Sequence, residues 1–321
     1  MRRRNVLTFE QFPFQVTKSS RHYFKMRKKI AFVVNPISGS RTDKSKITEP
    51  IGTLLDRSIY GEIQIAYTEY RGHGTELASQ FLRDGFERIV AVGGDGTVNE
   101  VGKALIHTDV ALGVISTGSG NGLARHLHIP MNFKKAIEQL NFSESVKIDY
   151  GLVNGKPFFC TAGTGFDAYV SQKFAGSKKR GVIGYLEQMV TGYLNYEPQH
   201  YRLVRKDIDF EGKAFVITFA NASQWGNNAY IAPNASVQDG LIDISIITNV
   251  PITAIPSLAF ELFTKNIQKD FLFNSMQADE ITLFRDSKGP FHLDGDAYEE
   301  GEKIHIRMIR DGLNVLVKKR F

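Results

Sequence analysis

The residues from Gly93 to Glu100 read Gly-Gly-Asp-Gly-Thr-Val-Asn-Glu, and they directly follow the apolar run from Ile89 to Val92. Glycines let a backbone adopt positive φ angles and approach a ligand, so several N–H groups can turn toward one anion. Asp95 adds a carboxylate, which suits a phosphate site if a divalent cation or a transferable proton lies between the two. The segment therefore predicts a phosphate-binding loop that supports phosphoryl transfer.

The same segment also fits an ordinary turn between a strand and a helix. Thr97 would cap the N-terminus of the helix, and Glu100, three residues later, would return the hydrogen bond. Phosphate sites are commonly built at helix N-termini, so this structural interpretation is compatible with the functional one.

Two further polar loops follow apolar runs. Residues 35–39 read Asn-Pro-Ile-Ser-Gly, where Ser38 offers a hydroxyl and the proline fixes a turn. Residues 117–127 read Thr-Gly-Ser-Gly-Asn-Gly-Leu-Ala-Arg-His-Leu, where Ser119 and Asn121 stand between glycines. Each loop alone resembles a simple turn, but together with the Gly93 loop they favour a shared ligand site.

Three side chains beside these loops have two interpretations each. The hydroxyl of Thr68, which ends an apolar run, either contacts a nucleotide or only ends the strand. Arg125 could meet an anion from the turn that follows the third loop, or it could be solvated. For His126 we expect a solvated side chain.

Two acidic turns lie in the second half of the chain. Asp294 and Asp296 flank a glycine after an apolar run, and this spacing alone favours a hairpin turn. They are nevertheless the best candidates for a general base supplied from outside the glycine loops. Asp239 also begins a hairpin-like turn, whose carboxylate and carbonyl oxygens would suit Mg²⁺.

The glycine loops need strands to present them, and strand-like and helix-like segments do alternate from Lys29 onward. This order predicts a doubly wound α/β domain with a parallel sheet. The expected strands are residues 30–34, 63–67, 89–92 and 111–115, and the expected helices are residues 46–55, 75–83, 97–106 and 133–140. Because the polar loops all follow strands, they should meet at the carboxyl edge of the sheet, where ligands bind.

After about residue 146 the pattern changes to closely spaced strand-like runs, which predicts an antiparallel β-sandwich. The expected strands are residues 146–153, 201–210, 215–220, 241–247, 281–284, 291–293, 304–309 and 313–317. Helical insertions are expected at residues 182–196 and 253–269. The chain is thus divided into an N-terminal extension (1–27), an α/β domain (28–145) and a β-sandwich domain (146–321) whose last residues could pack back on the α/β domain.

The insertion at residues 182–196 is apolar and aromatic at helical spacing, and it follows Lys178, Lys179 and Arg180. One interpretation is a helix that faces the core. The other is a helix at the entry of an apolar substrate, with its basic lead on anionic lipid headgroups. The sequence does not separate the two.

The composition of the 321-residue chain, with 42% hydrophobic and 23% charged residues, is that of a globular protein. Its 40 basic and 34 acidic residues give a net charge of +6, which suits an anionic partner such as a nucleotide, an acidic membrane or a nucleic acid. The single cysteine, Cys160, excludes an internal disulfide and fits a reducing compartment. No apolar run reaches the length of a membrane span, so we expect a cytoplasmic protein.

The loops at residues 35–39, 93–100 and 118–127 and the Asp-Gly-Asp turn, taken in this order, resemble the diacylglycerol kinase catalytic family. That family includes bacterial soluble lipid kinases and sphingosine kinases. The resemblance extends over about residues 28 to 321. The combination is more specific than the Gly93 loop alone, which NAD kinases and phosphofructokinases share.

The resemblance implies an ATP-binding α/β domain, a β-sandwich domain for the lipid substrate, and a cleft between them. The ATP contacts that it implies are Asn35, Pro36, Ile37, Ser38, Gly39, Thr68, Gly93, Gly94, Asp95, Gly96, Thr97, Val98, Asn99 and Ser119. It also implies a structural Mg²⁺ held by Ser236, Asp239 and Leu241, the last through its carbonyl. The family usually ends its catalytic turn with glutamate, but this chain has the shorter Asp296, and Asp294 stays an alternative base.

We therefore predict an ATP- and Mg²⁺-dependent kinase that phosphorylates the hydroxyl of a diacylglycerol-like or sphingoid lipid, with Asp95 taking part in catalysis. It would act at a membrane surface rich in anionic headgroups, as a peripheral membrane protein without a nucleic-acid partner, and a homodimer is left open. Two alternatives remain, a kinase of a soluble acceptor such as NAD and a non-catalytic, nucleotide-responsive lipid-binding protein.

Overall fold

The computed structural model describes residues 6–8, 27–39, 45–175, 192–193 and 195–319. Residues 41–44, the basic lead at 178–180 and most of the insertion at 182–196 lie outside this part of the chain. Within the described residues, no helix combines the length and the apolar character needed to cross a membrane.

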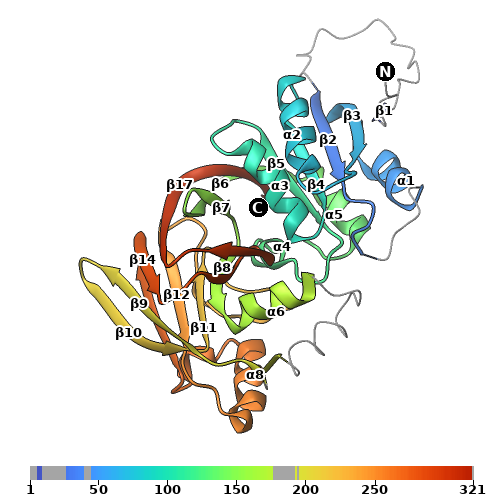
Figure 1. The fold of residues 1–321 in the computed structure, drawn as a ribbon. Helices are drawn as coiled ribbons and strands as arrows, with labels where there is room; N and C mark the ends of the chain where they lie inside the picture. The colour runs from blue at the N-terminus through green and yellow to red at the C-terminus, as the bar shows by residue number, and fades with distance from the viewer. Residues whose placement is uncertain (1–5, 9–26, 40–44, 176–191, 194, 320–321) are drawn as a thin grey trace, which may run out of the picture.

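The N-terminal half contains the parallel sheet that the alternating pattern predicts (Figure 1). Its strands are β2 (Lys28–Val34), β3 (Tyr60–Tyr67), β4 (Arg88–Gly93) and β5 (Ala111–Ser116), in the order β3-β2-β4-β5. Every residue of β4 and β5 is buried, as expected for parallel strands that are covered on both faces. The helices are α1 (Ser45–Leu54), α2 (His73–Arg83), α3 (Asp95–Leu105), α4 (Gly122–His126) and α5 (Phe133–Leu140).

The register of these strands brings the three polar loops together. Val34 at the end of β2 pairs with Val92 of β4, and Gly93 at the end of β4 pairs with Ser116 of β5. The loops that follow the three strands therefore leave the sheet side by side. Beside β3, at the end of the strand order opposite β5, part of the predicted extension forms the short strand β1 (Val6–Thr8), which pairs antiparallel with β3.

The C-terminal half is built from antiparallel strands, so the predicted fold class is confirmed. One six-stranded sheet has the order β13-β12-β11-β8-β15-β16, and β14, β9 and β10 continue the first sheet. The strands of this half are β7 (Lys156–Phe158), β8 (Thr161–Gly165), β9 (Gln199–Arg205), β10 (Ile208–Ala214), β11 (Val216–Ala220), β12 (Ile242–Ile247), β13 (Phe273–Ala278), β14 (Glu280–Arg285), β15 (Gly289–Leu293) and β16 (Asp296–Glu300). The helix α6 (Phe166–Ala175) follows β8.

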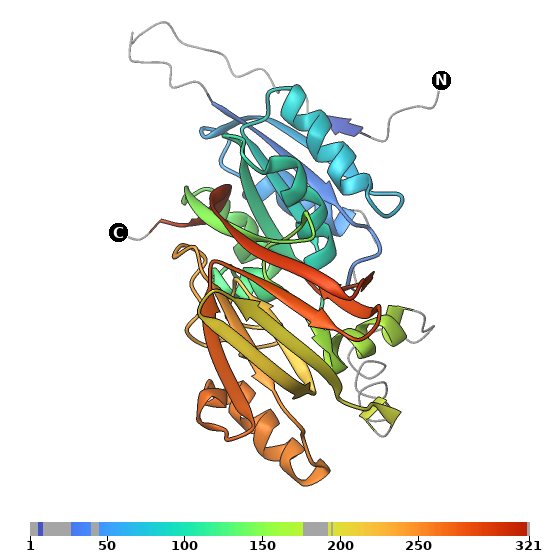
Figure 2. The ribbon, with the colours of Figure 1, turned by 60° about the vertical axis from the view of Figure 1, so that its left-hand side comes forward.

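Two long strands join the halves. β6 (Ser143–Val153) pairs along most of its length with β17 (Lys303–Lys318), and β17 also pairs in parallel with β5, where Val315 lies opposite Leu112. One sheet consequently runs through both halves of the molecule. Figure 2 shows this C-terminal strand, in red, along the boundary between the halves.

Several predicted segments differ in detail from the structure. The strands expected at 304–309 and 313–317 are one strand, β17, with an irregularity where Asp311 has a φ of 52°. The strand expected at 201–210 is the start of the β9–β10 hairpin. The helix expected at 253–269 is three pieces, η1 (Ile252–Ala254), α8 (Ile255–Thr264) and η2 (Ile267–Lys269).

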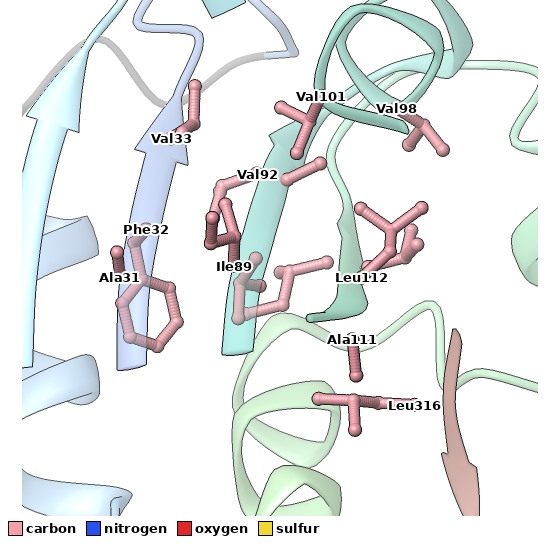
Figure 3. Packing of buried hydrophobic residues seen from close by; sticks show 14 of the residues in the cluster. Ala31, Phe32, Val33, Ile89, Val92, Val98, Val101, Ala111, Leu112 and Leu316 are labelled. Atoms are coloured by element: carbon pink, nitrogen blue, oxygen red, sulfur yellow. The ribbon is translucent and has the colours of Figure 1, made fainter. Parts of the chain in front are cut away.

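The largest core cluster lies in the N-terminal half and includes residues from both ends of the chain (Figure 3). Val92 from β4 and Leu112 from β5 are fully buried, and Leu316 of β17 packs in the same cluster. A second cluster fills the space between the two sheets of the C-terminal half, and a third packs α6 and α8 against its second sheet. The end of the chain is thus part of the core that supports the glycine loops.

Candidate active site

The Gly93 loop connects β4 to α3, and its glycines act by close approach. A β-carbon at Gly93 would lie 2.3 Å from Oγ1 of Thr97, so only glycine fits beneath that side chain. A β-carbon at Gly118 would lie 2.7 Å from the Cα of Gly94, so the Gly93 loop and the loop at residues 117–127 are in backbone contact. None of the three glycines of this loop has a positive φ, so of the two properties that glycine offers, only close approach is used here.

The helix behind this loop begins earlier than predicted. Gly94 is the N-cap of α3, and Asp95 is the first helical residue. Glu100 does not return a hydrogen bond to Thr97, because its carboxylate accepts from the N–H groups of Gly72 (2.7 Å) and Gly74 (2.9 Å). The predicted capping box is therefore wrong, while the start of a helix at the loop is correct.

Asp95 connects the Gly93 loop to the loop at residues 117–127. Its Oδ2 accepts from the N–H of Asn121 at 2.8 Å, and its Oδ1 accepts from the N–H of Gly122 at 3.0 Å. Burial, together with the charge of Asp294, raises the pKa of the Asp95 carboxyl to about 6, although the two N–H donors oppose this shift. Because ionisation of this buried carboxyl costs free energy, a bound cation would stabilise its charged form.

The loop at residues 35–39 completes the cluster. Oγ1 of Thr117 donates to Oγ of Ser38 at 3.0 Å, and Nδ2 of Asn35 donates to Oγ1 of Thr97 at 3.3 Å. Gly39 has a φ of 73°, and a β-carbon there would lie 2.4 Å from the carbonyl oxygen of Thr117. The three loops that the sequence analysis singled out are thus one contiguous surface.

The other residues predicted to contact the nucleotide lie in different surroundings from one another. Thr68 follows β3, and its N–H donates to the carbonyl of Val34 at the root of the first loop. Ser119 is exposed on the third loop, and Ile37 is 69% exposed on the first. Val98 is buried in the N-terminal core, so only its backbone faces the loop. Asn99 turns toward the C-terminal half, where its Nδ2 donates to Oδ2 of Asp294 at 2.7 Å.

The two aspartates of the Asp-Gly-Asp turn have different surroundings. Asp294 is buried and accepts hydrogen bonds from the N–H groups of Phe159, Cys160 and Thr161 as well as from Asn99. Burial raises the pKa of its carboxyl, and these donors oppose the change. Asp294 therefore holds the backbone before β8 against α3, and it has little freedom to accept a proton from a substrate.

Asp296 begins β16 and is open to solvent, with 45% of its side chain exposed. A β-carbon at Gly96 would lie 3.3 Å from Oδ1 of Asp296, so this carboxylate lies directly against the Gly93 loop. Its Oδ2 accepts from Nη2 of Arg71 at 3.2 Å. An acidic group from the C-terminal half thus faces the Gly93 loop of the N-terminal half.

The turn expected to hold a structural metal lies before β12. Oγ of Ser236 accepts from the N–H of Gln238, and Oδ1 of Asp239 accepts from the N–H of Leu241. The described residues include no group of three or more histidine, cysteine or acidic side chains that could hold a metal. The turn itself is fixed from below by Asp149, whose Oδ2 accepts from the N–H of Gly240 at 2.7 Å.

One unsatisfied oxygen beside this turn fits a cation. Oδ2 of Asp243 is buried and has no hydrogen-bond partner among the described residues. Burial, reinforced by the charge of Asp239, raises the pKa of the Asp243 carboxyl to about 6. Carboxylate and carbonyl oxygens are the ligands that Mg²⁺ or Ca²⁺ prefers, so this oxygen is of a type that could bind such an ion.

Sequence reasoning missed several residues that join the halves. His126 is not solvated, because its Nδ1 accepts from the N–H of Ser223 at 3.1 Å and burial lowers its pKa to about 4. Arg125 donates to the carbonyl of Gly120 and to Oδ1 of Asn228. Ser223 and Asn228 are about a hundred residues away from these side chains in the sequence, and no local pattern signals them.

Two family profiles match this chain. The diacylglycerol kinase catalytic domain matches residues 29–153, and the YegS C-terminal NAD kinase beta sandwich-like domain matches residues 160–316. The chain therefore contains a diacylglycerol kinase catalytic domain, followed by a YegS C-terminal domain. The resemblance stated from the motifs is therefore confirmed.

Curated relatives match the chain over most of its length. The chain is 27% identical to "Probable lipid kinase YegS-like" of Citrobacter koseri and to "Probable lipid kinase YegS" of Salmonella dublin, over 86% of this chain and 93% of each relative. It is also similar to a solved diacylglycerol kinase structure from Bacillus anthracis, with a TM-score of 0.66 and 18% identity over 90% of this chain and 97% of that one. The solved structure supports the fold.

Proposed function

We propose that the protein transfers the γ-phosphoryl group of ATP to the hydroxyl of a membrane lipid, either a diacylglycerol-like or a sphingoid lipid. The observation that carries this proposal is the position of Asp296, whose Oδ1 lies against Gly96 of the glycine loop. A phosphate held by the loop and an acceptor hydroxyl held by the aspartate would meet between these two residues. The match of residues 29–153 to the diacylglycerol kinase catalytic domain, and the relatives named probable lipid kinases, support a lipid acceptor.

The nucleotide would lie over the three glycine-bearing loops. Their close backbone packing leaves N–H groups at the N-terminus of α3 to bind phosphate oxygens. Asn35, Ser38 and Thr68 contribute polar atoms at the roots of the loops, and exposed Ser119 lies at the rim. Val98 and Asn99 would act through the shape of the helix, since their side chains face the core and Asp294.

In the transfer step the acceptor oxygen forms a bond to the γ-phosphorus, and the bond from that phosphorus to the bridging oxygen of ADP breaks. The hydroxyl proton passes to the carboxylate of Asp296, and ADP leaves. Because the transition state of phosphoryl transfer is largely dissociative, orientation and charge matter more than base strength. Asp294, which is bound by backbone N–H groups, would position the turn that carries Asp296.

Magnesium would have two places in this scheme. Bound with ATP, Mg²⁺ neutralises charge on the phosphates, and Asp95 is the acidic group of the loop nearest to them. A second cation would be held by Asp239 with the carbonyls of Ser236 and Leu241, beside the unsatisfied oxygen of Asp243. That second ion would stabilise the turn and take no part in the reaction.

Exposed aromatic side chains supply a surface for a lipid bilayer. Phe260 and Phe263 on α8 and Phe271 beyond η2 are 67%, 57% and 86% exposed, and Ile252 is 60% exposed. Helix α8 lies at the end of the C-terminal half farthest from the parallel strands (Figure 1). Phenylalanine with neighbouring lysines, here Lys265 and Lys269, is typical of surfaces that rest in the headgroup region of a membrane.

An ADP-release assay would test the function. Diacylglycerol, monoacylglycerol, sphingoid bases and ceramide in mixed micelles would each be offered with Mg·ATP, and NAD would serve as a soluble acceptor. We expect turnover with one lipid class and a loss of at least about a hundredfold in kcat for Asp296→Asn, the range for a general base. Asp294→Asn is the matched comparison, and it should lower the melting temperature, which Asp296→Asn should not.

The alternatives make different predictions in the same assay. Phosphorylation of NAD without phosphorylation of any lipid would establish a kinase of a soluble acceptor. ATP binding without ADP formation would establish a nucleotide-responsive binding protein. Wild-type turnover in Asp296→Asn would overturn the role given to that carboxylate.

A further inference from the structure

Arg71 lies in the loop between β3 and α2, and it contacts the C-terminal half. Its Nη2 donates to Oδ2 of Asp296 at 3.2 Å, and its guanidinium lies 5.6 Å from the centre of the Tyr298 ring. Arg71 thus connects a loop of the nucleotide-binding half to the acidic turn on the opposite side. None of the sequence motifs includes this residue.

The helix of the glycine loop itself fixes the position of the Arg71 loop. The Glu100 carboxylate of α3 accepts from the N–H groups of Gly72 at 2.7 Å and Gly74 at 2.9 Å, and its carbonyl accepts from Oγ1 of Thr75 at 2.7 Å. Gly72 has a φ of 89°, where a side chain would be strained. Glu100, the last residue of the Gly93 loop, therefore fixes the backbone next to Arg71 and with it the position from which the Arg71 side chain extends.

The Asp296 carboxylate contacts both the Gly93 loop and Arg71. Oδ1 of Asp296 faces Gly96, Oδ2 of the same carboxylate faces Arg71, and 67% of the Arg71 side chain is exposed. A guanidinium has five N–H donors in a planar fork, so its bond to Asp296 leaves donors for a second anion. These donors lie next to the place where the glycine loop would present a phosphate.

The charge of the surroundings gives this arginine a role. Asp95, Asp294 and Asp296 are all acidic, and a polyphosphate would add further negative charge. Two other cations nearby already have partners: Arg125 bonds to Gly120 and Asn228, and Lys156 pairs with Glu300. Arg71 is the described basic side chain in direct contact with Asp296 that retains exposed donors.

We propose that Arg71 is a phosphate-contacting residue that holds Asp296 against the glycine loop and donates its remaining N–H groups to the γ-phosphoryl group of ATP. This inference rests on the proposed function. In the transfer step the guanidinium neutralises charge on the equatorial phosphoryl oxygens while Asp296 receives the hydroxyl proton. Arginine suits both tasks because its planar fork can bind a carboxylate and a phosphate together.

The test compares Arg71→Gln and Arg71→Lys with the control Arg202→Gln. Arg202 also pairs with an acidic residue, Asp209, but it lies on the exposed β9–β10 hairpin. Calorimetry would measure the affinity for ADP and for a non-hydrolysable ATP analogue, and the ADP-release assay would measure kcat and KM. We expect Arg71→Gln to bind the analogue about tenfold more weakly and ADP within about twofold, since one charge-assisted hydrogen bond is lost.

The expected loss in kcat for Arg71→Gln is about 10- to 100-fold, with partial retention in Arg71→Lys and no change in Arg202→Gln. Melting temperatures near the wild-type value would exclude a folding defect. An unchanged ratio of analogue to ADP affinity in Arg71→Gln would overturn the inference, whether or not the wild type phosphorylates a lipid. A changed ratio in a protein that phosphorylates no lipid would retain the inference and reject the proposed function, and failure of the wild type to bind either nucleotide would reject both.

Discussion

At the scale of single residues, the acidic groups of the site differ in how the backbone binds them. Asp95 accepts two N–H groups from the third loop, Asp294 accepts several from the segment before β8, and Asp296 bonds instead to the Arg71 side chain. A carboxylate that is surrounded by backbone donors is fixed in place, whereas one that is paired with an exposed side chain can change partner. The three positions therefore suit cation contact, support and proton acceptance respectively.

Substitution of Asp95 by asparagine should separate catalysis from stability. Burial raises the pKa of this carboxyl to about 6, so an ionised Asp95 costs the folded protein free energy that asparagine does not. We expect kcat to fall by at least about a hundredfold, as when a main electrostatic group of an active site is removed. In thermal melts at pH 7.5 without nucleotide, the variant should unfold no earlier than the wild type.

The control for this substitution is Asp109→Asn, at an exposed position outside the loops. It should leave both kcat and the melting temperature unchanged. Near-wild-type turnover in Asp95→Asn would contradict the role of Asp95, and early unfolding would show that its carboxylate supports the loops instead.

The sequence identified all three glycine-bearing loops and the acidic turn, because their glycines, polar residues and preceding apolar runs are local. It could not choose between Asp294 and Asp296, since that choice depends on N–H donors from residues 159–161, more than a hundred positions away. It also assigned the wrong partner to Glu100, whose carboxylate accepts from the N–H groups of Gly72 and Gly74, beside Arg71. Arg71 itself is recognisable only once β3 and β16 are placed in space.

At the scale of elements, the short helix α4 joins the third glycine loop to the C-terminal half. The N–H of Ser223 donates to Nδ1 of His126, which requires a neutral ring at that nitrogen. Burial lowers the pKa of His126 to about 4, compared with about 6.5 in an unfolded chain. The interaction therefore stabilises the fold only while the imidazole is unprotonated.

This shift predicts a pH dependence with a definite sign. Below pH 6.5 the unfolded chain binds a proton at His126 more readily than the folded one, so its contribution to the free energy of unfolding is complete above pH 6.5 and is lost as the pH falls toward 4. His126→Asn keeps an acceptor for the Ser223 N–H but cannot titrate. We expect its melting temperature to fall less than that of the wild type between pH 7 and pH 4.5.

The control for the titration is His305→Asn, at a strand position where about half of the side chain is exposed. This variant should follow the wild-type pH dependence more closely than His126→Asn does. Parallel pH profiles for His126→Asn and the wild type would contradict a buried neutral histidine.

Element types followed from the sequence wherever the pattern was periodic, and the strands that present the loops are correct. β17 was split in two because Asp311 and Gly312 look like a turn, although the strand continues through them beside β6. The sequence could not say whether the glycines at 93, 94 and 96 serve positive φ angles or close approach, and the structure shows close packing against Thr97, Gly118 and Asp296. Such contacts depend on the tertiary structure and leave no local signal.

At the scale of the whole molecule, one sheet passes through both halves, because β17 pairs with β5 on one side of the boundary and with β14 on the other. The hydrogen bonds of Asp294, His126 and Arg125 cross the same boundary. The halves are therefore linked by strands and by side chains at the site. This arrangement favours a site of fixed geometry, to which the lipid acceptor of the proposed reaction would have to be brought.

We expect the apolar surface around α8 to bind the membrane that carries the lipid. This binding can be tested separately from phosphoryl transfer. The triple variant Phe260→Ser, Phe263→Ser and Phe271→Ser removes three exposed rings, each of which would bury apolar area in a bilayer. In co-sedimentation with phosphatidylcholine–phosphatidylglycerol vesicles, we expect at least a roughly tenfold loss of binding. Turnover should fall with vesicle-borne lipid but be retained with a short-chain lipid in solution.

Phe142 and Phe284 make the matched control, because they are exposed by 63% and 37% but lie outside α8 and its neighbours, between α5 and β6 and on β14. Their replacement by serine should leave vesicle binding intact, since a bilayer that contacts α8 does not require them. Equal losses in both variants would mean that general surface hydrophobicity, and not this surface, drives binding. If the triple variant binds vesicles normally but changes its sedimentation velocity, the surface joins two copies of the chain, and the lipid must reach Asp296 by another route.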